Sequence, residues 1–308
     1  MEESSRPAVI VTMRDAERTI ARTLSCLADQ TVADFDVILV DDCSSSSSGL
    51  EIAHGFSECL NLTVVALDTN LGVAEAKNRG VRATQAELVA FLDSDDEVLP
   101  EWLESLTSAL GDRDVVSCAY LVRELDEAGR LLRTRRMLAP CLSTDSWRQL
   151  LSGTFLVRRD LFLSVGGYDQ AAEPMDNLDL SLSLARTGAR HVTVDRELFI
   201  YNARKTGKAK RDDYAQKSAL NIRYFLDKHR WYYQSRRKEV ARSLEVAATG
   251  AARTGLGRDA GLLILRAFWT RPNPKIGLKM LLFTLATPLG AGVARWRERK
   301  HINRMIDA

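Results

Sequence analysis

The sequence lacks cysteines at paired spacing and any apolar run long enough to span a bilayer, and we expect no secretory leader. Its five cysteines are scattered and none has CxxC spacing, which argues against a disulfide framework and against a zinc site. Residues 1–7 are polar and include two acids, unlike a signal peptide. Met280–Ala294 is uncharged over only fifteen residues, whereas a spanning helix needs about twenty. We therefore expect a cytoplasmic protein with reduced thiols.

Two common nucleotide-binding and nucleic-acid-binding signatures are absent as well. No GxGxxG motif follows the first apolar strand, which disfavours a dinucleotide-binding oxidoreductase. Trp231, Tyr232 and Tyr233 lie near basic residues, but no nucleic-acid-binding motif accompanies them. We therefore expect no nucleic-acid partner.

Charge is divided unevenly along the 308 residues, although the net charge is only +2. Residues 202–308 hold 24 Lys and Arg against 8 Asp and Glu, whereas residues 1–201 hold 19 against 33. An acidic front part and a strongly basic end indicate two surfaces with different partners. The length and this shift predict a globular domain at residues 1–204 and a basic helical region at residues 205–308.

The front part alternates apolar runs of strand length with segments of helical spacing. The first four strands are expected at 8–11, 35–40, 62–67 and 88–92, with helices between them. Further strands are expected at 115–122, 153–157, 191–194 and 198–201, and helices at 145–151 and 178–187. This alternation predicts an α/β fold with a mostly parallel central sheet flanked by helices.

Two of the predicted strands end in adjacent carboxylates. Asp41-Asp42 follows the second strand and Asp93-Ser94-Asp95-Asp96 follows the fourth. Ligands of open α/β sheets bind at this carboxyl edge. Close carboxylates suit Mn²⁺ or Mg²⁺, which take oxygen ligands and also hold substrate phosphates. The alternative is a solvated acidic turn that caps the helix expected near Pro100.

Four segments in this order resemble the motifs of one family. They are the opening strand and loop Val9–Glu17, the VDDxS-like Val40–Ser44, the NxGxxxA(R/K)NxG-like Asn70–Gly80 and the FLDxDD-like Phe91–Asp96. The family is the inverting nucleotide-sugar glycosyltransferases of family 2, and the resemblance covers residues 8–201. It implies a Rossmann-like GT-A catalytic domain at 1–204 with a helical C-terminal extension.

The resemblance also implies roles for individual residues. Thr12 and Asp42 would bind the nucleotide base, Lys77 would face the donor nucleotide, and Asp93 would contact the ribose or the metal. Asp95 would coordinate Mn²⁺ or Mg²⁺, which neutralises the charge that grows on the diphosphate leaving group. The alternatives are that Asp42 only caps the next helix and that Lys77 is a solvated helix residue.

The chain departs from the family pattern at two functional places. Arg14-Asp15 stands where Tyr-Asn is usual, and Arg14 would contact phosphate as a forked cation. Asp176-Asn177 stands where Glu-Asp is usual, and Asn cannot accept the proton that the family's general base takes. We expect Asp176 to be the base and Asn177 to hold the acceptor. The other possibilities are that Asp179 is the base or that the chain is inactive.

These residues predict a metal-dependent transfer of a single sugar, with inversion, from a nucleotide-sugar that is by family bias a UDP-sugar. The acceptor would be a cell-envelope, lipid-linked or polysaccharide molecule. The QxxRW motif is absent, since Arg230-Trp231 lacks the Gln, which argues against a processive polysaccharide synthase. The alternative function is a catalytically impaired relative that serves as a nucleotide-binding or assembly subunit.

The basic end of the chain predicts a further partner. The uncharged stretch Met280–Ala294 lies between Lys275, Lys279 and Arg295, Arg297. An apolar segment between cations is typical of a helix in the interface of an anionic membrane. We therefore expect peripheral attachment to the inner face of the cell membrane. The alternative is a helix packed on the catalytic domain.

Overall fold

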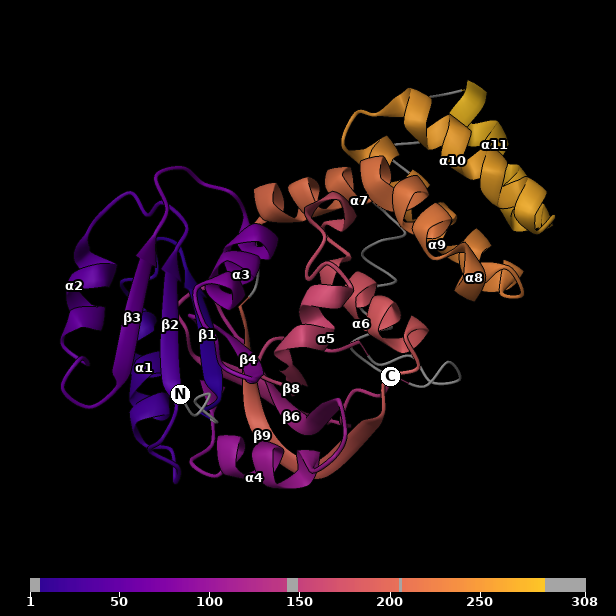
Figure 1. The fold of residues 1–308 in the computed structure, drawn as a ribbon. Helices are drawn as coiled ribbons and strands as arrows, with labels where there is room; N and C mark the ends of the chain where they lie inside the picture. Colours follow the sequence, from indigo (N-terminus) through magenta and orange to yellow (C-terminus); the bar gives the residue numbers. More distant parts are fainter. Residues whose placement is uncertain (1–5, 143–148, 205–206, 286–308) are drawn as a thin grey trace. The chain divides into compact units, whose positions relative to one another are not determined.

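The computed structural model describes residues 6–142, 149–204 and 207–285 of the chain. The chain divides into two compact units (Figure 1). The first comprises Met1–Gln170 and Asp176–Lys205, and the second comprises Ala171–Met175 and Thr206–Ala308. The first unit is an α/β domain and the second is built of helices.

A nine-stranded sheet forms the centre of the first unit, in the order β3-β2-β1-β4-β8-β6-β9-β5, with β7 paired to β6. The strands are β1 Ala8–Met13, β2 Asp36–Asp41, β3 Asn61–Ala66, β4 Leu88–Asp93, β5 Glu97–Val98, β6 Val115–Leu125, β7 Leu131–Met137, β8 Phe155–Arg158 and β9 His191–Arg204. Strands β3, β2, β1 and β4 run parallel, as do β6 and β9, while β5, β7 and β8 pair antiparallel. The predicted α/β fold with a mostly parallel sheet is confirmed.

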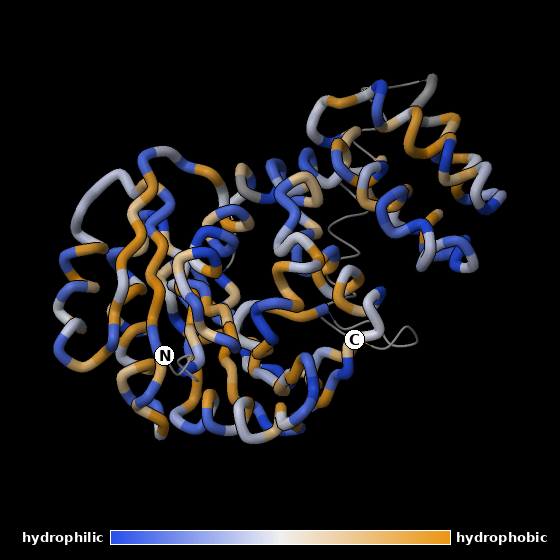
Figure 2. Tube along the Cα trace, in the orientation of Figure 1, coloured by the Kyte–Doolittle hydropathy of each residue, from blue (hydrophilic) through white to orange (hydrophobic). Residues whose placement is uncertain are grey.

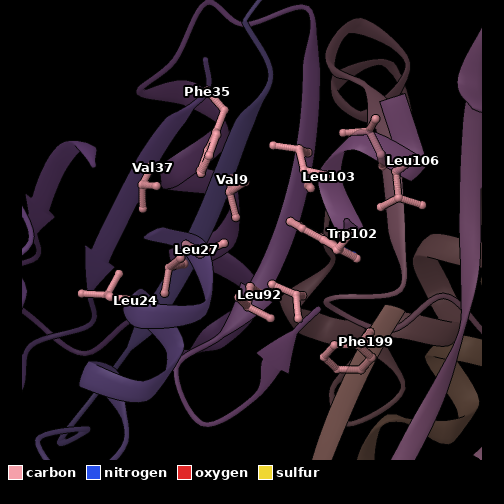
Figure 3. Packing of buried hydrophobic residues seen from close by; sticks show 14 of the residues in the cluster. Val9, Leu24, Leu27, Phe35, Val37, Leu92, Trp102, Leu103, Leu106 and Phe199 are labelled. Carbon is pink, nitrogen blue, oxygen red and sulfur yellow. The ribbon is translucent and has the colours of Figure 1, made fainter. Parts of the chain in front are cut away.

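Helices cover both faces of this sheet (Figure 1). They are α1 Ile20–Ala28, α2 Ser48–His54, α3 Val73–Arg82, α4 Trp102–Leu110, α5 Arg159–Ser164 and α6 Asp176–Arg186. Successive strand residues point to opposite faces. Val9, Val37 and Leu92 therefore pack with α1 and α4 (Figure 3), whereas Ile10 and Phe91 pack with α3, α5 and α6. Burial on both faces explains why these strands are almost wholly apolar, as Figure 2 shows.

Helix α3 packs very close to strand β1 of the sheet. A Cβ atom at Gly80 would meet Ile10 Cγ2 at 2.3 Å, so only glycine allows this approach. Asn78, two residues earlier, donates from Nδ2 to the Tyr168 carbonyl (2.8 Å) and accepts from the Tyr168 N–H (2.9 Å). The motif Asn78-Arg79-Gly80 thus holds α3 to β1 and to the Gly166-Gly167-Tyr168 turn.

The second half of the domain differs from prediction in several elements. Strands predicted at 191–194 and 198–201 are one strand, β9, because Asp195 and Arg196 bulge out of its ladder with β6. Helix α5 and the short strand β5 were not predicted from the sequence. The helix predicted at 145–151 falls partly outside the described residues, and residues 149–151 are not helical.

The second unit consists of five helices among the described residues. They are α7 Lys208–Lys228, α8 Arg230–Tyr233, α9 Arg237–Arg253, α10 Gly257–Thr270 and α11 Pro274–Leu285. Its interior is formed by buried apolar residues such as Phe225, Leu244, Leu263 and Ile264. Within the parts of the chain that the structure describes, no helix is long and apolar enough to cross a membrane. Most of the predicted tail segment Met280–Ala294 lies outside the described residues.

A half-buried histidine, His191, connects the two long strands β6 and β9. The Ser117 hydroxyl donates to the Pro140 carbonyl (2.6 Å), so His191 Nε2–H donates to Ser117 Oγ (3.0 Å). His191 Nδ1 then accepts from the Leu142 N–H (3.5 Å). Burial lowers the pKa of His191 to about 4. The neutral imidazole is therefore the form that the fold accommodates.

The free energy of unfolding should consequently fall in mild acid. An unfolded histidine titrates near pH 6.5, above the folded value of about 4. The stabilisation is therefore complete above about pH 6.5 and is lost as the pH falls towards 4, by about 2–3 kcal/mol near pH 4.5. Urea denaturation at neutral pH and near pH 4.5 should show a smaller loss for His191→Gln than for the parent chain. Equal losses would show that His191 does not set this dependence.

Candidate active site

The carboxyl ends of β1, β2 and β4 bring the predicted donor-binding residues to one edge of the sheet. Thr12 pairs in register with Val40 of β2 and with Asp93 of β4. The Ser94 N–H also donates to the Thr12 carbonyl (3.3 Å), which ties the acidic turn to the end of β1. Thr12 is buried, whereas the Asp93 side chain is 36% exposed. Topology alone therefore gathers side chains that lie some eighty residues apart in the sequence.

Lys77 of α3 is buried against this edge rather than solvated. Its Nζ lies 2.9 Å from Asp93 Oδ1, 2.5 Å from Ser152 Oγ and 5.2 Å from the centre of the Tyr168 ring. Only 1% of the residue is exposed. Burial alone would lower the pKa of Lys77, but attraction by Asp93 and other nearby groups outweighs it and raises the pKa. The ammonium therefore stays charged at neutral pH and holds Asp93 in place.

Asp176 lies in the same electrostatic cluster. It is the first residue of α6 and only 8% of it is exposed. Burial raises the pKa of Asp176, with a smaller rise from Asp93, while Lys77 opposes the shift. A carboxylate whose pKa is raised is a better proton acceptor than an ordinary one. The structure thus places Lys77, Asp93 and Asp176 within one electrostatic cluster.

Two other polar residues of α6, Asn177 and Asp179, differ from Asp176 in burial and hydrogen bonding. The Asn177 carbonyl accepts from the Ser181 hydroxyl (2.7 Å), but its buried side-chain Oδ1 has no hydrogen-bond partner among the described residues. A buried acceptor without a donor is costly, so Oδ1 is suited to a donor that a bound molecule supplies. Asp179 is completely buried, so it is less accessible to such a molecule than Asp176 is.

Three acids lie at the end of β4 and in the turn after it, namely Asp93, Asp95 and Asp96. One of them is buried and hydrogen-bonded within the fold, and the other two are accessible to solvent. Asp96 is 1% exposed and accepts from the Asn202 N–H of β9 (2.8 Å). Burial, together with repulsion by Asp95 and Asp93, raises the pKa of Asp96 well above its usual range. Asp95 is exposed, and its carbonyl accepts from Arg22 (2.7 Å). Asp93 and Asp95 are therefore the acids that a bound molecule can reach.

Asp42 organises the approach to α3. Its Oδ2 accepts from Asn70 Nδ2 (2.8 Å) and the Gly72 N–H (2.9 Å), and its Oδ1 accepts from the Leu71 N–H (2.7 Å). A carboxylate offers about four acceptor positions, so one position on Oδ1 remains for a ligand donor. The carboxylate caps the turn before α3, and the remaining position is compatible with the predicted contact to a nucleotide base.

Replacing Asp42 should therefore affect both stability and nucleotide binding. We expect Asp42→Ala to lose about 2–3 kcal/mol of unfolding free energy, because three donors of the 70–72 turn lose a charged acceptor. UDP should bind more weakly to the variant, while any dependence on Mn²⁺ remains. Asp68→Ala, at an exposed acid of the same segment, is the control. Equal weakening of UDP and pyrophosphate binding would contradict a contact between Asp42 and the base.

Arg14 and Tyr201 complete the exposed side of the site. The half-exposed Arg14 guanidinium lies 3.9 Å from Asp15, which accepts from the Ser45 N–H (2.7 Å). Tyr201 of β9 was not singled out from the sequence. The residue is 42% exposed, while partial burial and repulsion by Asp96 and Asp95 raise the pKa of Tyr201 to about 12. An exposed aromatic beside the acidic turn could not be foreseen without the pairing of β9.

Comparison with known proteins identifies relatives of the chain. The family model described as glycosyl transferase family 2 matches residues 8–169. An uncharacterised glycosyltransferase of Haemophilus influenzae is 28% identical over 185 residues, which are 58% of this chain and 61% of that protein. AmsB, an amylovoran biosynthesis glycosyltransferase of Erwinia amylovora, is 27% identical over 71% of this chain and 85% of its own length. The chain thus spans less than two thirds of the first of these relatives.

A solved structure gives the fold. Staphylococcus aureus TarS in complex with UDP-GlcNAc superposes with a TM-score of 0.55 at 19% identity, over 86% of this chain and 88% of that one. Such low identity shows the fold alone, and it confirms the expected GT-A fold. The family match begins at β1, includes the segments that carry Asp42, Lys77 and Asp93, and covers just over half of the chain. The chain belongs to glycosyl transferase family 2.

Proposed function

We propose that the chain transfers one sugar, with inversion, from a UDP-sugar to a hydroxyl of a cell-envelope, lipid-linked or polysaccharide acceptor. The observation that carries this proposal is the buried cluster in which Lys77 pairs with Asp93 beside Asp176. In this cluster the predicted donor contact, Asp93, lies near the predicted base for the acceptor, Asp176. TarS forms complexes with UDP-GlcNAc and with UDP, and AmsB takes part in amylovoran biosynthesis, which supports the donor and acceptor classes.

The exposed acids fit a divalent cation that is completed by the substrate. No group of three or more His, Cys, Asp or Glu in the described part of the chain is arranged to hold a metal. Mg²⁺ in phosphate sites is usually held by one or two carboxylates together with substrate phosphates, and Asp93 and Asp95 supply that number. Asp95, with Asp93 beside it, would hold Mn²⁺ or Mg²⁺. When bound, the cation offsets negative charge on the diphosphate.

The chain's own residues then perform the transfer. Asp176 accepts the proton of the acceptor hydroxyl as its oxygen bonds to the anomeric carbon. The bond from that carbon to the diphosphate oxygen breaks, and UDP leaves on the opposite side of the sugar. The Asn177 side chain accepts a hydrogen bond from the acceptor, which orients the attacking hydroxyl. Lys77 keeps Asp93 fixed and, through its charge, keeps Asp176 ionised.

Thermal unfolding with UDP, in the presence and absence of Mn²⁺, tests the donor half of the proposal. A ligand that binds only the folded chain raises its stability by about 2.7 kcal/mol at a hundred times its dissociation constant. We expect UDP to raise the melting temperature when Mn²⁺ is present and to raise it little without the metal. No shift with UDP under either condition would contradict a UDP-sugar donor.

Asp95→Ala should remove the metal-dependent part of this shift. The side chain is exposed at an acidic turn, so its removal relieves repulsion and should cost little stability without ligand. The variant should show the same small UDP shift with and without Mn²⁺. Asp160→Ala, which removes an almost fully exposed carboxylate of α5, is the control and should keep the parent response. A parent-like response in Asp95→Ala would exclude Asp95 as a metal ligand.

One observation favours a second candidate, a catalytically impaired relative that binds nucleotide within an assembly. Asn177 occupies the place where the family resemblance implies a carboxylate base. An impaired chain should bind UDP and Mn²⁺ as the first proposal requires but release no UDP from any UDP-sugar. Gain of UDP release in Asn177→Asp, from a parent that releases none, would favour this second candidate.

A further inference from the structure

Helix α10 presents an apolar face that stays exposed among the described residues of its unit. Its buried side is formed by Ala260, Leu263, Ile264 and Ala267. Leu262, Leu265 and Trp269 lie on the other side and are 51%, 40% and 70% exposed. Their spacing of three and four residues places them on one face of the helix. Trp269 is the most exposed large apolar residue among those described.

Helix α11, which packs against α10, continues the pattern. Ile276 is buried, whereas Leu278 and Leu281, three residues apart, are 56% and 51% exposed. Figure 2 shows hydrophobic stretches along both helices, interrupted by hydrophilic residues. Each helix therefore has one apolar side inside the unit and a second apolar side in contact with solvent. Exposed apolar surface of this kind marks a site of interaction.

The charges around this face are almost all positive. Residues 257–281 contain five cations, namely Arg258, Arg266, Arg271, Lys275 and Lys279, and one acid, Asp259. Two of the cations are paired within the unit, Arg266 with Asp227 and Lys279 with Glu245. The exposed Arg258, Arg271 and Lys275 form no ion pair with any residue that the structure describes. The uncompensated charge favours an anionic partner.

We propose that the exposed face of α10 and α11, defined by Leu262, Leu265, Trp269, Leu278 and Leu281, lies in the interface of an anionic phospholipid bilayer. Leucines and a tryptophan suit the boundary between headgroups and acyl chains, and neighbouring cations attract anionic headgroups. A second copy of the chain is a poorer partner. A symmetric dimer places the same patch of both copies together, so their unpaired cations would repel. This attachment does not depend on the proposed transferase activity.

Flotation of the full chain with lipid vesicles tests the proposal. We expect the chain to float with vesicles of equal parts phosphatidylglycerol and phosphatidylcholine, but not with pure phosphatidylcholine, and to float less at high salt. The variant Leu262→Gln/Leu265→Gln/Trp269→Gln should lower the partition coefficient at least about a hundredfold. Val246→Gln, at a 58% exposed valine of α9, is the matched control and should float as the parent does.

The charge contribution has its own variant. Arg258→Gln/Arg271→Gln/Lys275→Gln should weaken flotation by roughly fivefold for each cation removed and should reduce the effect of salt. Both triple variants should keep the parent melting temperature and its response to UDP, because all six positions are exposed.

Three results would overturn the proposal. The first is that the full chain stays unbound on anionic vesicles. The second is that the apolar triple variant floats as well as the parent, which would assign any attachment to another segment. The third is a dimer that the apolar triple variant abolishes, which would assign the face to a second copy.

Discussion

Asp176→Asn should reduce turnover by roughly a hundredfold or more while the affinity for UDP stays within a few-fold of the parent. The amide keeps the shape of the side chain but cannot accept a proton from the acceptor. The measurement is UDP release from the donor, with acceptor or with water in its place, at saturating donor. UDP affinity is measured separately by titration. Loss of turnover with UDP affinity retained indicates a base, whereas a residue that only supports the fold would affect both.

Two further variants sharpen this result. Glu173→Gln, the control, removes an acid three residues before Asp176 in the sequence, which belongs to the second unit and pairs with Lys217 (3.4 Å), so it should keep parent turnover. Lys77→Met should move the acid limb of the pH–rate profile to higher pH, because Lys77 lowers the pKa of Asp176. Turnover that survives in Asp176→Asn would show that another group takes the proton.

Breaking the buried ion pair should have the largest effect on stability. We expect Lys77→Met to cost about 3 kcal/mol of unfolding free energy, the lower end of the range for a buried pair, because Asp93 is still a third exposed. Asp93→Asn should cost a similar amount, since it leaves a buried ammonium without its carboxylate. The double variant should lose less than the sum by about 1–3 kcal/mol.

Chemical denaturation of the four proteins measures this coupling. Arg79→Met on the same helix is the control, because Arg79 forms an exposed pair with Glu75 and should cost less than about 1 kcal/mol. Additive losses in the double variant would show that Lys77 and Asp93 do not stabilise each other. The site would then lack the anchored Asp93 that the proposed donor binding requires.

The strands that position the site were readable from the sequence because their residues are apolar without interruption. Parallel strands buried on both faces need such runs, and the acids that end β2 and β4 stand out against them. The adjacency of Thr12 and Asp93 then follows from strand order. Helix α6 was less clear, because Leu178, Leu180, Leu182 and Leu184 alternate as a strand does. It is a helix whose Leu180 and Leu184, four residues apart, enter the core.

Other features of the site depend on contacts that no local pattern encodes. Lys77 sits on a helix whose sequence is mostly hydrophilic, and its burial follows from the close approach that Gly80 permits and from Ser152, seventy-five residues away. The three acids of the turn look equivalent in sequence. Asp96 becomes structural only because β9 brings the Asn202 N–H to it. The burial of Lys77 and the structural role of Asp96 therefore depend on contacts with residues far away in the sequence.

The most direct test of the central claim is UDP release by the full chain from a panel of UDP-sugars, with Mn²⁺ and with a chelator. We expect at least one donor to be consumed when Mn²⁺ is present, slowly with water and faster with a hydroxyl acceptor. Release should fall to background with chelator and in Asp176→Asn. Binding of UDP without release from any UDP-sugar, with or without Mn²⁺, would contradict a sugar transferase.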